Sequence, residues 1–155
     1  MSDVTAKLAE LGLELPKPAA PVAAYVPAVE HGGLLYISGQ LPFRDGQVVT
    51  GRLGDDTDVA SGYDAARRCA LMLVAQIGQA LDGDWSRVER VVKLGVFVNS
   101  TPAFTDQGKV ANGASELFES LFGEAGRHAR AAVGVAVLPL GAAVEADAVV
   151  AVRPA

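Results

Sequence analysis

Residues 128–152 read HARAAVGVAVLPLGAAVEADAVVAV, and this stretch gives the strongest indication of the fold class. Two runs rich in valine and alanine, 129–137 and 143–152, flank the sequence LPLGA at 138–142. Two such runs about a Pro- and Gly-containing turn predict a β-hairpin. Because side chains alternate along a strand, one face of this hairpin would carry charged and small side chains. The residues on that face are Arg130, Ala132, Gly134, Ala136, Glu145, Asp147, Val149 and Ala151.

That face combines one arginine and two carboxylates with a floor of alanine and glycine, which leaves room for a small ligand. In the predicted register Arg130 stands six residues from the position opposite Glu145, or roughly 20 Å, so the two could meet only across a subunit boundary. A structural ion pair is one interpretation of these charges. The other is a site for a small acid, because an arginine fork matches a carboxylate and a nearby carboxylate can activate water.

Outward from this hairpin, strands alternate with helices. Apolar spacing predicts a short helix from Ser2 to Leu11, a long helix over 58–81 and another over 104–122. Strands are expected at 23–29, 34–38 and 91–98, with a loop or irregular hairpin at 43–56. The order β-β-α-β-α-β-β, after an N-terminal helix and connector in residues 1–20, predicts a single α+β domain over residues 1–155. Two long helices cover only one face of such apolar strands, so we expect a symmetric oligomer to bury the other.

Composition excludes several classes of function. The chain has 155 residues, half of them apolar, and 13 basic against 18 acidic residues give a net charge of −5. This balance argues against binding nucleic acid through phosphate contacts. The lone Cys69 fits a buried thiol, and without a disulfide partner or a targeting segment a cytoplasmic location is expected. With two histidines and no HExxH or CxxC pattern, we expect no metal and no cofactor, and no run is long enough to cross a membrane.

Several segments resemble the Rid/YjgF-like family, the reactive intermediate deaminases long labelled endoribonuclease L-PSP. Residues 128–152 are similar to the family signature, in which an arginine opens a strand, Leu-Pro makes the turn and Val-Glu enters the last strand. LLYISGQLP at 34–42 resembles the second strand with its Ser-Gly-Gln, and VVKLGVFVNS at 91–100 resembles the middle strand. Tyr25 stands where members have an active-site tyrosine. The resemblance runs from about Pro21 to the C-terminus.

The resemblance implies a chorismate-mutase-like fold, with two helices on one face of the sheet, assembled as a barrel-like homotrimer with sites between subunits. It implies that Arg130 binds the carboxylate of a 2-imino or 2-enamino acid. Glu145 would position the water whose attack releases ammonia and a 2-keto acid. Tyr25, Ser38 and Gly39 would line the pocket, and the backbone of Ala132 would donate a hydrogen bond. The expected partner is a small carboxylate-bearing metabolite, with no nucleic acid and no membrane.

The chain departs from the family pattern in two places. Its long helix contains SGYDAARRCALM at 61–72 in place of a Gln-rich start and a Leu-x-Asn, and the loop at 100–104 lacks an asparagine that some members place near the site. These differences indicate a divergent subgroup. Two alternative functions remain. The protein could be a trimeric small-acid sensor or chaperone-like protein that binds without turnover, or an endoribonuclease, which the negative net charge and the lack of a base-stacking aromatic patch disfavour. A chorismate mutase needs several cations around a dicarboxylate, and the predicted face offers one.

Overall fold

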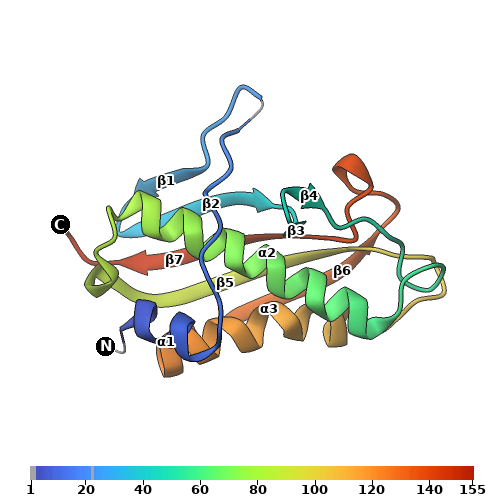
Figure 1. The fold of residues 1–155 in the computed structure, drawn as a ribbon. Coiled ribbons are helices and arrows are strands. Elements are labelled where there is room, and N and C mark those ends of the chain that lie inside the picture. Colours follow the sequence, from blue (N-terminus) through green and yellow to red (C-terminus); the bar gives the residue numbers. More distant parts are fainter. Residues whose placement is uncertain (1–2, 22) are drawn as a thin grey trace.

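The computed structural model describes residues 3–21 and 23–155, and its main feature is a five-stranded mixed sheet with helices on one face (Figure 1). The helices are α1 (Val4–Glu10), α2 (Val59–Ala80) and α3 (Gln107–Phe122). The strands of the main sheet are β1 (Ala28–His31), β2 (Leu34–Gln40), β5 (Val88–Asn99), β6 (Ala129–Val135) and β7 (Val144–Val152). A second sheet pairs β3 (Phe43–Arg44) with β4 (Gln47–Val48). The α+β class is confirmed, and so is an irregular hairpin within 43–56.

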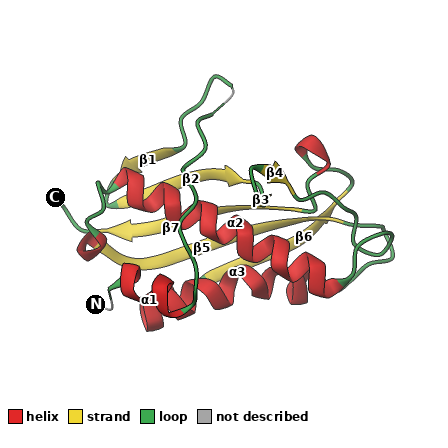
Figure 2. Cartoon of the chain, viewed as in Figure 1, coloured by secondary structure: helices red, strands yellow, loops and turns green. Residues whose placement is uncertain are grey.

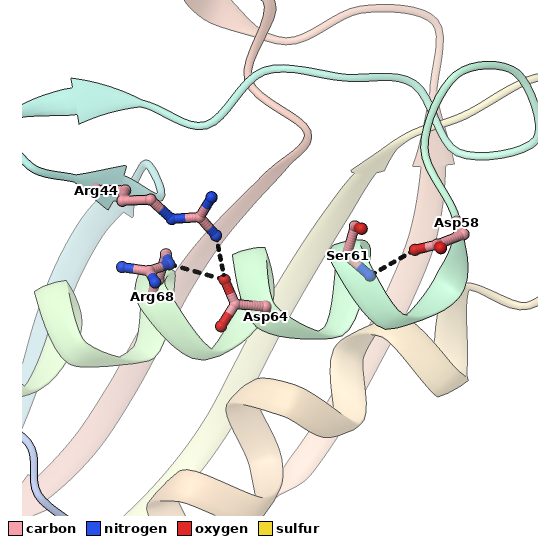
Figure 3. A network of polar contacts seen from close by, with 5 residues as sticks. All are labelled: Arg44, Asp58, Ser61, Asp64 and Arg68. Carbon is pink, nitrogen blue, oxygen red and sulfur yellow. Dashed lines mark hydrogen bonds and ion pairs between the residues drawn. The ribbon is translucent and has the colours of Figure 1, made fainter.

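The long helix α2 begins and ends where its sequence pattern predicts. The Asp58 side chain caps it by accepting a hydrogen bond from the Ser61 backbone N–H at 2.7 Å, a common way to satisfy a helix N-terminus. One turn further on, the Asp64 carboxylate accepts hydrogen bonds from Arg68 at 2.8 Å and from Arg44 of β3 at 2.7 Å (Figure 3). The small β3–β4 hairpin is thereby attached to the solvent side of α2.

The N-terminal helix packs into the same core. Ser2, the expected cap, lies outside the described residues, and the observed cap is Asp3, which accepts from the Thr5 backbone N–H at 3.0 Å. Val4 and Leu8 are buried. The connector that follows then crosses α2 (Figure 1), where the Ala19 carbonyl accepts a hydrogen bond from Gln76 at 3.0 Å.

The predicted C-terminal hairpin is wrong, because the strand order is β1-β2-β7-β5-β6 and β5 lies between the two C-terminal strands. β6 runs parallel to β5, and β7 runs antiparallel to β5. The reason is that α3 returns the chain to the starting end of β5, which makes β5-α3-β6 a crossover unit of two parallel strands. Residues 136–143 then pass the end of β5 instead of forming a tight turn. The predicted strand at 23–29 is also misplaced, since β1 begins at Ala28.

The two faces of the sheet differ in what covers them. Helices α2 and α3 cross one face (Figure 2), and the alternate residues of β7 that are buried there are Val144, Ala146, Ala148, Val150 and Val152. The opposite face, here called the open face, carries Glu145 and Asp147 from β7 together with large apolar side chains. Tyr36 and Val133 are 46% and 45% exposed in the single chain. None of the described helices has the length and apolarity needed to span a membrane.

Candidate functional site

Arg130 lies on the edge strand β6, with its side chain toward the helices. It pairs with Leu94 of β5, a fully buried core residue, and the two side chains therefore share the helical face of the sheet. The Arg130 guanidinium donates from Nη1 to Asn112 Oδ1 at 2.9 Å and to Ser115 Oγ at 3.1 Å, and from Nη2 to the Gly108 carbonyl at 3.4 Å. These acceptors recur at helical spacing along one side of α3. α3 thus fixes the direction of the guanidinium.

The hydrogen bonds continue from Ser115 to His128. The His128 Nδ1 lies 2.7 Å from the Gly126 carbonyl, which can only accept, so Nδ1 carries the proton and Nε2 accepts from the Ser115 hydroxyl at 2.9 Å. Burial, together with the nearby charge of Arg130, lowers the pKa of His128, which keeps the ring neutral at physiological pH. The hydrogen bonds therefore form a series in which Arg130 donates to Ser115, Ser115 donates to His128, and His128 donates to the Gly126 carbonyl. In such a series each hydrogen bond polarises the next.

One edge of the Arg130 guanidinium remains available. Within residues 3–21 and 23–155, its Nε–H and one Nη2–H have no hydrogen-bond acceptor, while both Nη1 hydrogens are engaged. A carboxylate fits such an edge through two parallel hydrogen bonds. Arg130 also borders a cavity of about 200 Å³, together with Ser115, Glu119, Gly126, Arg127 and His128. Ala132, two residues along β6 on the same side, is half-buried and adds no bulk to this surface.

Glu145 lies on the open face, in a different setting. It pairs with Phe97 of β5 and its carboxyl group lies across β2, where a Cβ at Gly39 would come within 2.6 Å of Glu145 Oε1. Glycine at position 39 leaves space for the carboxyl group in this position, and a larger residue would displace it. Burial, with a smaller effect from the charge of Asp147, raises the pKa of Glu145, as expected of a carboxyl group that can exchange a proton during catalysis.

Tyr25 and Ser38 lie near Gly39. The Ser38 hydroxyl donates to the Val26 carbonyl at 2.8 Å, and the Ser38 backbone N–H donates to the Pro27 carbonyl at 2.9 Å. Ser38 thus attaches the segment that bears Tyr25 to strand β2. Tyr25 is 51% exposed, and it lines a cavity of about 170 Å³ together with Gly39.

The structure therefore divides the predicted site residues into two groups. Arg130 and Ala132 lie on the helical face at the β6 edge, and Glu145, Gly39 and Tyr25 lie at β2 and β7, with β5 between the groups. The prediction that Arg130 and Glu145 share one face is wrong, because it rested on the incorrect hairpin. The prediction that they do not meet within one chain stands, since their side chains leave the sheet on opposite sides.

Asn112 is a site residue that the sequence analysis missed. An asparagine was sought in the loop at 100–104, but the structure provides one from the next helix, where it contacts Arg130. The signal was present in α3 as polar or small residues at 108, 112 and 115, which form one stripe at helical spacing.

Other chemistries find little support in the described part of the chain. No three or more His, Cys, Asp or Glu side chains gather there in a way that could hold a metal ion. Cys69 is fully buried in α2, with its thiol 3.5 Å from the Val144 carbonyl. Burial raises the pKa of this thiol, so it is a poor nucleophile.

Comparison with known proteins gives consistent results. The family model described as YjgF/chorismate_mutase-like, which also carries an endoribonuclease label, matches residues 5–148. "Protein TCP17" of Trypanosoma cruzi is 58% identical over 149 residues, covering 95% of this chain and 92% of that protein. The crystal structure of Atu1372 from Agrobacterium tumefaciens, of unknown function, is 50% identical, has a TM-score of 0.91, and is matched over 97% of this chain and 92% of that one.

A third relative bears the name of an activity. The 2-iminobutanoate/2-iminopropanoate deaminase of Dermatophagoides farinae is 29% identical over 138 residues, which cover 86% of this chain and 89% of that protein. The fold and these matches together define a small α+β domain of the YjgF/chorismate mutase-like kind. The chain belongs to this family, also called Rid or RutC.

Proposed function

We propose that the protein hydrolyses reactive 2-imino and 2-enamino acids to 2-keto acids and ammonia. The observation that carries this proposal is the Arg130 guanidinium, which α3 holds by three hydrogen bonds while one edge stays open for a carboxylate. A planar fork held in this way recognises a carboxylate through two bonds and fixes its orientation. Membership of a family with a deaminase-named relative supports the reaction class.

The reaction needs a water molecule and a proton carrier besides the carboxylate site. Glu145 takes a proton from water as the oxygen attacks C2 of the imine, and passes that proton to the imine nitrogen to give a carbinolamine. Glu145 then takes the proton of the carbinolamine hydroxyl and delivers it to the amino nitrogen as the C–N bond breaks, which forms the C2 carbonyl and expels ammonia. One imino acid and one water thus become one 2-keto acid and one ammonia. Burial, which raises the Glu145 pKa, makes this exchange easier near neutral pH.

A complete site requires two subunits. Arg130 and Glu145 leave opposite faces of one sheet, so the carboxylate-binding group of one chain must face the Glu145 group of another. The open face favours such an assembly, because it exposes Tyr36 and Val133 among other apolar side chains, and large exposed apolar areas mark interaction surfaces. A ring-like homotrimer, in which each chain contributes one group to each of two sites, satisfies this requirement with a single repeated interface.

The direct test is the release of ammonia and 2-keto acid from imines generated in the assay by an amino-acid oxidase. Wild-type protein should accelerate this release, and Arg130→Ala should abolish the acceleration. Arg127→Ala is the matched control, because Arg127 borders the same cavity and is 61% exposed, with only ion pairs of 3.5 and 3.6 Å. Hydrolysis that is equally fast with and without protein would contradict the deaminase proposal. If 2-keto acids still bound through Arg130, the protein would be a small-acid-binding protein.

A further inference from the structure

A second arginine, Arg52, lines a separate pocket at the far end of β6. The pocket has a volume of about 380 Å³, and its lining comes from the ends of β5 and β6, the start of α3 and the segment before α2. The lining residues used below are Arg52, Ser100, Gln107, Gly134 and Ala136. None of the residues that line this pocket is acidic.

The Arg52 side chain lacks the partner that a partly buried arginine ordinarily has. Its Nε is buried without a hydrogen-bond acceptor, and its guanidinium forms no ion pair with any carboxylate in the described ranges. The nearby Asp56 uses its carboxylate to accept from the Arg52 backbone N–H at 2.7 Å and from Thr57. These hydrogen bonds and, to a smaller extent, the charge of Arg52 lower the pKa of Asp56. Because the buried Nε–H has no acceptor, a ligand anion bound beside it would supply one.

A serine hydroxyl opens into the same pocket. Ser100 is only 6% exposed, and its hydroxyl has no hydrogen-bond partner among the residues that the structure describes. Gly134 leaves the space beside the Ser100 hydroxyl empty, because a Cβ at position 134 would lie 2.6 Å from Ser100 Oγ and 2.9 Å from Gln107 Nε2. Arg52 and Ser100 therefore provide hydrogen-bond donors around a space left by a missing side chain. Gln107 adds its second Nε2 hydrogen, since the first is donated to the Phe104 carbonyl at 2.8 Å. This set of donors suits a carboxylate.

The Arg52 pocket and the Arg130 cavity share no lining residue, but both lie along β6 and α3. Ala132 and Gly134 follow Arg130 on the same side of β6, with roughly 13 Å of strand from Arg130 to Gly134. Gln107 in the pocket and Gly108 at the Arg130 guanidinium are consecutive residues of α3. The β6 residues between the two arginines on this side, Ala132 and Gly134, are small, and the Gln107 side chain lies over Gly134.

We propose that Arg52 binds a second acidic group of the same ligand, so that the site takes dicarboxylic 2-imino acids and their 2-keto acid products. This inference rests on the proposed function, because Arg130 must hold the 2-carboxylate. Two guanidinium groups discriminate between ligands by charge. A monocarboxylate would leave Arg52 unpaired, whereas a diacid of suitable length would pair both cations.

The test is calorimetric titration with stable 2-keto acids of matched length. 2-Oxoglutarate and 2-oxoadipate are the diacids, and 2-oxopentanoate and 2-oxohexanoate are the corresponding monoacids. At least one diacid should bind the wild-type protein about tenfold or more tightly than its monoacid. Arg52→Gln should remove this preference without weakening monoacid binding, and Arg130→Ala should abolish binding of both classes.

Two further variants make the result interpretable. Lys109→Gln removes one charge beside the start of α3 from a side chain 68% exposed and outside the pocket, so it should keep the preference. Ala136→Glu places a carboxylate in the pocket and should reproduce the loss even if Arg52→Gln folds poorly. Equal binding of diacid and monoacid, or a preference that survives both pocket variants, would overturn this inference and leave the proposed function standing. A complete lack of 2-keto acid binding would instead refute the proposed function.

Discussion

Substitution of Arg130 by alanine separates a ligand-binding role from a structural one. The variant loses three solvent-accessible hydrogen bonds to α3, and the freed acceptors of Asn112, Ser115 and Gly108 can turn to water. The cost should be about 1–2 kcal/mol of folding free energy, or a few degrees in melting temperature. The ligand, by contrast, loses a bidentate charge-assisted pair worth about 3–6 kcal/mol, roughly a 100-fold to 20,000-fold fall in affinity.

The lysine variant sharpens this prediction. Arg130→Lys keeps the positive charge but cannot reach Asn112 and Ser115 while presenting a two-pronged edge to a carboxylate, so little activity should return. The assays are imine hydrolysis per folded protein, titration with a 2-keto acid, and thermal unfolding by circular dichroism. If Arg130→Ala unfolded many degrees earlier yet kept its turnover per folded protein, Arg130 would be a structural residue and the reasoning would be refuted.

Three further predictions follow from the same geometry. Glu145→Gln should remove hydrolysis while leaving 2-keto acid binding. A raised Glu145 pKa stabilises the folded protein below glutamate's ordinary pKa, and this contribution is lost as pH rises through the raised value, so the variant should be at least as stable as wild type at pH 7. Lower stability of the variant at pH 7 would contradict the assignment of Glu145 as a partly buried carboxyl group. Ser115→Ala should weaken ligand binding by roughly tenfold by loosening Arg130, and the binding should lose any pH dependence due to His128; unchanged binding would show that Asn112 alone orients the guanidinium. Sedimentation equilibrium should give three times the chain mass of 15.9 kDa, and a stable monomer at micromolar concentration would exclude shared sites.

The sequence predicted the helices well, because the apolar spacing and the capping residues that define a helix lie within or next to the helix itself. The apolar spacing over 58–81 and the carboxylate at Asp58 mark both the face and the start of α2, and Gly123 ends α3 in a left-handed conformation that glycine adopts readily. Strand pairing is not local in the same way. The run at 138–142 resembles a hairpin turn, and only the length of the β5-α3-β6 segment, which makes a parallel crossover natural, indicated that β5 would separate β6 from β7.

The candidate site was predictable residue by residue but not in its arrangement. Arg130 and Glu145 stood out because charges in β-rich runs need partners. The face of the sheet on which each residue lies, however, was predicted from the wrong strand pairing. Side-chain alternation along the predicted hairpin placed Arg130 and Glu145 on the same face. Asn112, Ser115 and Arg52 were missed because each acquires its importance from a contact distant in sequence or from a pocket, which no spacing rule reveals.

The central claim, that each site combines Arg130 of one chain with Glu145 of another, is tested most directly by mixing two inactive variants. Arg130→Ala and Glu145→Gln proteins would be unfolded together in equal amounts and refolded, so that chains assort at random. If sites lie between subunits of a ring, one interface in about four pairs an intact Arg130 with an intact Glu145, and about a quarter of wild-type activity should return. Activity that stayed at the level of the separate variants, with mixed oligomers verified by mass, would contradict shared sites.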